Sequence, residues 1–246
     1  MADDNKPIQY MRYAIGEIAL VVIGILIALQ VNNWNENRKT KKTEFEIYNE
    51  IKDDLAFSLN DLERGVADHY EWLDQTIKLR DHLMNQLPLS DDLARHLRNI
   101  DRDDQFFPRT SGYESLKSVG LKTLSNDTLR QQITNLFQLG FERIVGLGRD
   151  KAPIRNFTYL SPFIDTYMVL SEEDIYYSKF NEIDSTMMFV TKIKNYEMLL
   201  GDEKLLLKLQ DAISLRKFKI WNYDRIIRWA QKINNEIDEE LDRNQN

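Results

Sequence analysis

The sequence predicts an all-α protein, with an N-terminal transmembrane helix followed by a helical bundle whose first and last helices are long. Three observations support this fold class. Residues 14–31 form an apolar stretch with one charged residue, Glu17. Apolar residues then recur every three or four positions over residues 44–87 and 202–241, which is the spacing of one helix face. Nine glycines and five prolines are few for 246 residues, so helix breakers are rare.

The chain divides into four expected parts. These are a short N-terminal tail (1–12), a transmembrane helix (13–34), a basic juxtamembrane segment (35–43) and an α-helical bundle domain (44–246). No convincing strand appears, because the best candidate, residues 187–190, lies within a helical pattern that ends at Leu200. The absence of cysteine excludes a disulfide scaffold, cysteine nucleophiles and thiolate metal sites.

The apolar stretch is long enough to cross a bilayer, since about 20 helical residues span the hydrocarbon core. Tyr13 and Trp34 bracket it, as aromatic residues do at the two interfaces. The alternative is a cleaved signal peptide, whose apolar region would be shorter and followed by small residues at a cleavage site. We therefore expect an uncleaved, single-pass signal anchor with the lipid bilayer as its partner.

Two features inside the stretch allow a more specific interpretation. Gly24 and Ala28 are small residues four positions apart, where a second helix could approach closely, although such residues are common in membrane helices. Glu17 lies about one turn from Tyr13 and is interpreted as an anchor at the level of the headgroups. The alternative role for Glu17 is a proton-carrying carboxylate in an ion-driven membrane complex.

A basic cluster follows the apolar stretch and predicts contact with anionic headgroups. Its members are Arg38, Lys39, Lys41 and Lys42. By cation count the larger C-terminal part would lie in the cytoplasm, although a long segment can translocate regardless of such a bias. Residues 43–246 carry a net charge of −9, which repels polyanions, so no nucleic-acid partner is expected.

Segments at the start and in the middle of the chain resemble a known family. The opening reads YAIGEI from Tyr13, LVVIGILIALQ from Leu20 and NNWNE from Asn32, and the middle reads TSGYESLK from Thr110 and LSNDTLR from Leu124. They are similar to an uncharacterised bacterial family of single-span cell-envelope proteins, catalogued as a domain of unknown function. The resemblance implies an inner-membrane protein with a periplasmic C-terminal domain, and it supplies no catalytic residues.

The helix after the membrane segment carries a continuous apolar seam that must be covered. Two alternatives are open. The seam pairs antiparallel with the C-terminal helix of the same chain, which we favour, or it pairs with its copy in a second chain. In the second case a histidine would face its own copy and make assembly pH-sensitive near pH 6.5. The seam consists of Leu55, Leu59, Leu62, Val66, His69, Leu73 and Ile77.

Helix starts are indicated by capping residues in the middle of the chain. Ser111 and Glu114 have the spacing of a capping box, in which each side chain binds a free backbone N–H. Ser125 is expected to cap the next helix. The adjacent aspartate pairs, among them residues 53–54 and 103–104, are interpreted as solvated faces.

No catalytic, cofactor or metal site is predicted. His69, His82 and His96 lack metal-site spacing, and no phosphate-binding or nucleophile motif occurs. Near the C-terminus, the aromatic residues 221, 223 and 229 alternate with two arginines. This pattern predicts core packing under extended arginines, or alternatively a ligand pocket.

Three functions remain open at the level of sequence. The leading hypothesis is a non-enzymatic envelope protein whose domain binds or senses a partner, which would be another copy or a different envelope protein. The second is a membrane-tethered hydrolase that uses His69 or His96 with a carboxylate. The third is a small subunit of an ion-driven membrane complex, acting through Glu17.

Overall fold

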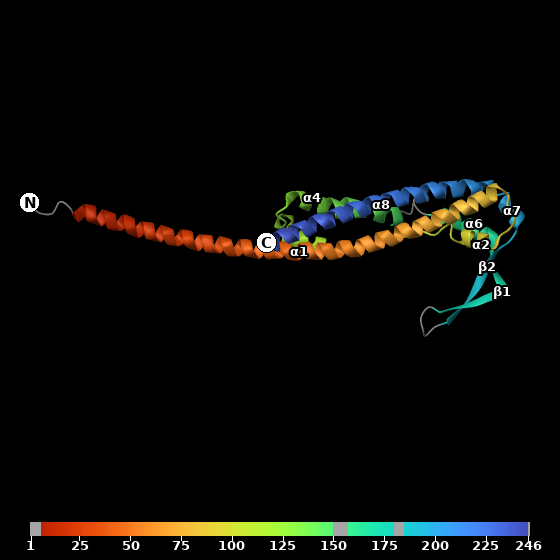
Figure 1. Cartoon of the computed structure of the whole chain (residues 1–246), viewed down its shortest axis with the longest axis horizontal. Coiled ribbons are helices and arrows are strands. Elements are labelled where there is room, and N and C mark those ends of the chain that lie inside the picture. Colours follow the sequence, from red (N-terminus) through yellow and green to blue (C-terminus); the bar gives the residue numbers. More distant parts are fainter. Residues whose placement is uncertain (1–5, 150–156, 180–184, 246) are drawn as a thin grey trace, which may run out of the picture.

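A computed structural model describes residues 6–149, 157–179 and 185–245, and the side chains of residues 16–148, 157–171 and 190–243. Its most extended element is α1 (Lys6–Met84), a single helix of 79 residues and about 120 Å (Figure 1). Helix α1 runs without interruption through Asn32 and Asn33. The apolar segment predicted to span a membrane and the first bundle helix are therefore one continuous helix.

The second long helix, α8 (Glu203–Gln245), packs antiparallel along the C-terminal half of α1 (Figure 1). Seam residues Leu55 and Leu62 of α1 share a core with Ile226 and Ile233 of α8. The predicted intrachain pairing of the two long helices is thus confirmed. It brings the described C-terminal end of the chain back beside α1. There the bundle ends and the exposed N-terminal part of α1, termed the free part, extends away from it.

Shorter helices cover the α1–α8 pair. They form because amphipathic segments of five to nine residues bury one face in the bundle. They are α2 (Asp91–Arg98), α3 (Ser111–Val119), α4 (Asp127–Asn135), α5 (Glu142–Arg149), α6 (Ser161–Tyr167) and α7 (Tyr196–Leu200). Single turns lie at Leu121–Thr123 and Thr158–Leu160, and a π-helical turn at Leu136–Phe141 joins α4 to α5.

A β-hairpin projects from the end of the bundle that is farthest from the N-terminus (Figure 1). Strands β1 (Met168–Lys179) and β2 (Ser185–Ile193) pair antiparallel, with an irregularity between Leu170 and Ile175. The all-α class is confirmed, but the helix predicted from residue 187 is wrong up to Ile193. Val190, Thr191 and Ile193 favour a strand once β1 offers them a partner, and that partner is not visible in a local pattern.

The core is divided into two large clusters along the α1–α8 pair. The cluster nearer the free end of α1 is built on Ile51, Leu55 and Leu62, and the distal cluster on Leu79 and Leu83. Between them α1 and α8 contribute a small apolar group around Leu73 and a set of buried polar side chains. The seam therefore contains a polar layer between two apolar blocks.

Candidate functional site

The expected membrane-anchor residues all lie on the free part of α1. Glu17, Gly24, Ala28 and Trp34 are exposed, and an added methyl group at Gly24 would meet no atom within 4 Å. No helix of the described part of the chain therefore packs against the small-residue pair. Tyr13 belongs to the helix, but its side chain lies outside the described residues.

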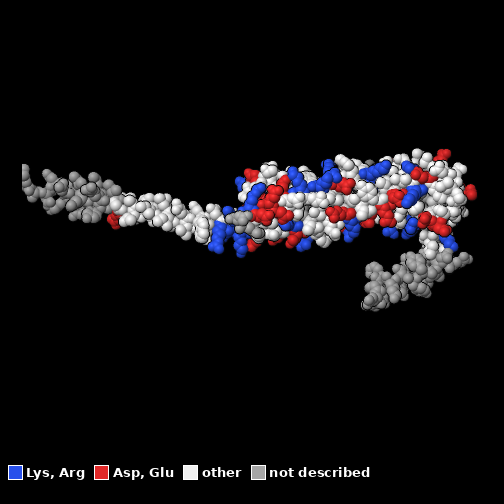
Figure 2. Space-filling view, in the orientation of Figure 1, with Lys and Arg blue, Asp and Glu red and all other residues white. Residues whose placement is uncertain are grey.

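The four cations of the basic cluster are exposed on the next turns of α1 (Figure 2). Arg38 lies 5.9 Å from the centre of the Trp34 ring, as expected for stacking of a guanidinium on an indole. Lys39 pairs with Glu36 at 3.0 Å, and Lys42 approaches Glu46 at 3.6 Å. Such exposed pairs contribute about 0.5 kcal/mol or less, so the cations stay available to an anionic surface.

Asp54 of α1 holds the N-terminus of α3, and its interpretation as a solvated residue is wrong. Its side chain is fully buried. One carboxylate oxygen accepts from the Ser111 hydroxyl at 2.7 Å, and the other from the Gly112 backbone N–H at 2.6 Å. A negative charge at a helix N-terminus also complements the helix dipole. The predicted capping box is wrong for the same reason, because the Ser111 hydroxyl binds Asp54 instead of its own helix.

Gly112 allows this close approach of α3 to α1. A Cβ atom at this position would lie 2.6 Å from the backbone of Glu50 and Ile51. Real Cβ atoms do not come so near to backbone atoms, and the backbone of a packed helix cannot move away cheaply. The SGYE segment is thus a docking motif: serine and glycine bind the buried carboxylate, and glycine leaves room for the neighbouring helix.

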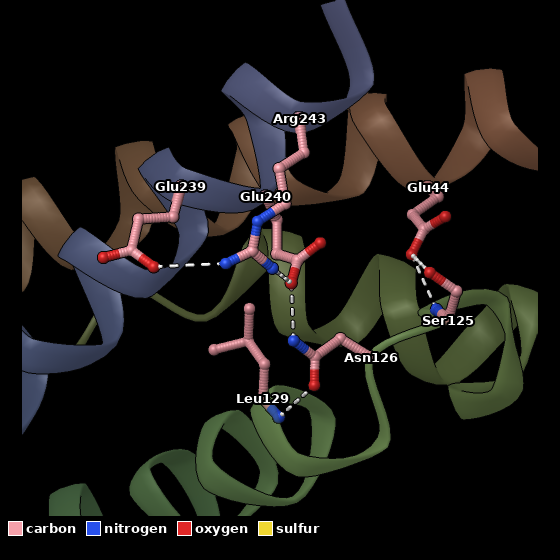
Figure 3. A network of polar contacts seen from close by, with 7 residues as sticks. All are labelled: Glu44, Ser125, Asn126, Leu129, Glu239, Glu240 and Arg243. Atoms are coloured by element: carbon pink, nitrogen blue, oxygen red, sulfur yellow. Dashed lines mark hydrogen bonds and ion pairs between the residues drawn. The ribbon is translucent and has the colours of Figure 1, made fainter. Parts of the chain in front are cut away.

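Glu44 of α1 makes a second carboxylate contact of this kind, at the start of α4 (Figure 3). It accepts from the Ser125 backbone N–H at 2.6 Å and from the Ser125 hydroxyl at 2.7 Å. The helix cap is Asn126 and not Ser125 as expected, since the Asn126 carbonyl accepts from the Leu129 N–H. Asn126 also donates to Glu240 of α8 at 2.6 Å. One loop therefore joins both long helices beside the free part of α1.

The polar layer lies midway along the bundle. Lys219 of α8 donates to both carboxylate oxygens of Asp103 at 2.6 Å. Arg216, one turn away, donates to the Ile100 carbonyl at 2.9 Å and stacks 3.9 Å from the centre of the Phe157 ring. Both cations are almost completely buried. They take seam positions between Ile213 and Ile220, where the pattern would otherwise place apolar residues.

His69 lies in this layer and not on an open seam. It is fully buried and makes edge contacts with Trp72 and Tyr223, so it cannot face a copy of itself. Its Nε2 is 3.7 Å from Asp103, beyond hydrogen-bond distance, and neither ring nitrogen has a hydrogen-bond partner among the described residues. Burial, with the nearby charges of Lys219 and Arg216, lowers the pKa of His69 to about 3.

The charges of the layer are destabilised by burial and stabilised by one another. Burial raises the pKa of Asp103 and lowers the pKa of Lys219, and their ion pair opposes both shifts. Burial likewise lowers the pKa of Arg216 to about 10, against the attraction of Asp103. Such a cluster contributes little net stability, but it ties α8 to the loop that follows α2, because a shifted α8 would leave the buried charges unpaired.

The polar layer contains residue types that occur in catalytic sites, but a substrate in solvent could not reach them. A histidine, a lysine and a carboxylate lie close together, yet His69 and Lys219 are buried away from solvent. His82 instead lies 2.7 Å from the Tyr196 hydroxyl, and His96 is half-buried on α2. Within residues 16–148, 157–171 and 190–243, no group of three or more histidine or acidic side chains could hold a metal ion.

Sequence reasoning missed Asp54, Arg216 and Lys219. A usable signal was present, since each is a charged residue within a run of core positions of a long helix. Asp54 stands between Ile51 and Leu55, as the two cations stand between Ile213 and Ile220. A charge at a seam position indicates a buried partner supplied by another part of the chain.

Comparison with known proteins gives one match. A model described as a family of unknown function (DUF6090) matches residues 17–153, more than half of the chain. The matched region contains the apolar part of α1, both carboxylates that hold α3 and α4, and the segments that they bind. No curated protein and no solved structure matches.

Proposed function

Because the chain belongs to this family of unknown function, we propose its role from its geometry: a single-pass membrane protein whose helical bundle is a non-enzymatic binding domain. In this proposal the span lies in the inner membrane of a bacterial cell envelope, and the bundle lies in the periplasm. The partner is another copy or another envelope protein, and no nucleic acid is bound.

The observation that carries the proposal is the exposure of the apolar part of α1. Ten aliphatic side chains between Ile18 and Val31 are about half exposed or more, on all sides of the helix. Covering such side chains is worth about 1.5–3 kcal/mol each, or about 15–30 kcal/mol together. One helix of the described chain is long and apolar enough to cross a membrane, and a bilayer would cover this stretch on every side at once.

The continuity of α1 gives the anchor a mechanical role. Since no loop or proline separates the span from the bundle, the bundle cannot rotate freely about its attachment. The start of α8 lies at the far end of the bundle, about 60 Å along α1 from Glu44. A helix of this kind holds a binding surface at a fixed distance and orientation from the membrane.

A binding role is favoured over the two alternatives by what the structure makes accessible. A hydrolase needs a histidine that reaches substrate, and His69, which the described residues place within 4 Å of a carboxylate, is fully buried. Glu17 is exposed on the free helix. No observation specifically favours the hydrolase or the ion-driven complex.

The natural absence of cysteine makes a direct test simple. Single cysteines are placed at Leu26 within the span and at Ser214, which is exposed on α8, and intact cells are treated with a membrane-impermeant maleimide. We expect labelling of Ser214→Cys in intact cells and of Leu26→Cys only after denaturation. Labelling of Leu26→Cys in the native protein would contradict a membrane span, and protection of Ser214→Cys until lysis would place the bundle in the cytoplasm.

A further inference from the structure

A groove with apolar walls lies between α5 and α8. Its cavity volume is about 620 Å³, within the range of ligand sites. Leu147, Leu215, Phe218 and Trp221 supply its apolar surface, and Gly146 leaves one wall without a side chain. An added methyl at Gly146 would meet no atom within 4 Å.

Two exposed aromatic side chains line this groove. Phe218 and Trp221 are each about half exposed, and their rings stack with centres 6.5 Å apart. The expectation that the C-terminal aromatic residues all serve core packing is wrong for Trp221, whereas Tyr223 is buried as expected. Exposed aromatic residues beside a groove are the residue types that dominate protein–protein binding energies.

Cations border the aromatic pair. Arg225 lies 5.0 Å from the centre of the Trp221 ring, Arg228 follows on the same face of α8, and Arg143 lines the opposite wall. Basic side chains are visible along the upper edge of the bundle, where α8 runs (Figure 2). The nearby acids are Glu142 and Asp224, while residues 43–246 as a whole carry a net charge of −9. The groove lining itself holds one acid and one cation, Glu142 and Arg143, and the arginines that follow Trp221 on α8 make its surroundings more basic than the rest of the domain.

We propose that this groove binds an acidic peptide segment of a partner protein, with an apolar or aromatic side chain of the segment inserted between Trp221, Phe218 and Leu147. The proposal rests on the binding role proposed above and names its surface. Charge complementarity selects the partner: the acidic remainder of the domain repels anions, so an acidic segment is guided to the arginines that flank the aromatic pair.

The bilayer that holds the N-terminal span cannot reach the groove between α5 and α8. Tyr223, next to the groove on α8, lies 5.6 Å from His69, which is about 50 Å along α1 from Trp34 at the end of the span. Electrostatic attraction to headgroups decays within about 10 Å at physiological salt. The groove thus faces proteins that stand away from the membrane surface.

The test uses the full chain in lipid nanodiscs and a fluorescein-labelled glutamate-rich peptide that carries one leucine and one phenylalanine, measured by fluorescence anisotropy. We expect saturable binding that weakens as salt is raised. Trp221→Ala and Arg225→Glu should each weaken it about tenfold or more. Tyr70→Ala is the matched control, since Tyr70 is an equally exposed aromatic residue on α1, and it should leave binding unchanged.

Three results would overturn the proposal: no saturable binding, equal binding of a peptide with lysine in place of glutamate, or equal binding of single-stranded DNA. Circular dichroism of each variant establishes that the fold is retained, and Phe218→Ser provides a second variant at the groove. Failure here is separable from failure of the proposed anchoring, because the maleimide pattern of Leu26→Cys and Ser214→Cys does not depend on the groove.

Discussion

Helix α1 has two regions that share one backbone and differ in what covers them. Residues 16–42 are exposed along the whole length of this region. Residues 44–84 bury one face against α8 and the short helices, with Ile51, Leu55 and Leu62 fully enclosed. The first region depends on its surroundings for burial, whereas the second depends on its own chain.

The difference shows that helix propensity does not decide where a helix is stable in water. Both regions are helical, but an isolated helix is marginal without a covered face. The change occurs at Glu44, where the Ser125 contacts begin and the side chains of α1 become buried.

Leu62→Asp should have the largest effect, because it places a charge in the closed part of the seam. The side chain is fully buried among apolar residues of α1 and α8. We expect a loss of about 4–5 kcal/mol or more in the free energy of unfolding, measured by chemical denaturation with circular dichroism. Phe57→Asp, at an exposed position of the same helix, should cost less than about 1 kcal/mol. Equal losses at the two positions would contradict the seam.

Gly112→Ala should cost about 2–4 kcal/mol, because the new methyl would lie 2.6 Å from the α1 backbone and push α3 away from Asp54. Chemical denaturation measures the loss. Asp54→Asn should also destabilise the bundle, since it removes the charge and one acceptor from the Ser111 and Gly112 contacts. An unchanged midpoint in Gly112→Ala would mean that α3 does not dock as described.

His69→Leu should remove an acid-dependent loss of stability. The folded pKa of His69 is about 3 and the unfolded value is 6.5, so the unfolded chain takes up a proton first as pH falls. The contribution of neutral His69 to the free energy of unfolding is complete above about pH 6.5 and declines as pH falls towards 3. The loss reaches about 2 kcal/mol by pH 5. Stability measured at pH 7 and pH 5 should therefore differ less in the variant. The raised pKa of Asp103 works in the opposite direction, so the comparison with the native chain is essential.

Gly146→Ala should have the smallest effect and the opposite sign to Gly112→Ala. The position is inside α5 with open space around the expected Cβ. Alanine restricts the unfolded chain and favours the helix, so we expect a gain of about 0.5–1 kcal/mol in chemical denaturation. A loss as large as that at Gly112 would show that the α5 wall of the groove is closed.

The two long helices and their pairing could be predicted because a seven-residue apolar repeat is a local property of the sequence. The hairpin could not, since Val190 and Thr191 favour a strand only with β1 beside them. A charge at a core position such as Asp54 indicates that a buried partner exists, but the sequence does not identify it, since the partners of Asp54 and Glu44 lie more than 50 positions away. Asp103 and its lysine show the same limit, as their pairing depends on how α8 is placed.

A spin-label scan along α1 in nanodiscs tests the central claim, that one continuous helix passes from lipid into protein. Collision with oxygen and with a water-soluble nickel complex is measured at successive single-cysteine positions. We expect high oxygen access and low nickel access at every position of residues 18–31. Across residues 47–83, minima of oxygen access and of nickel access should recur every three or four positions, at Ile51, Leu55 and Leu62 among others. A three-to-four-residue period within 18–31, or a break at Asn32 and Asn33, would contradict the account.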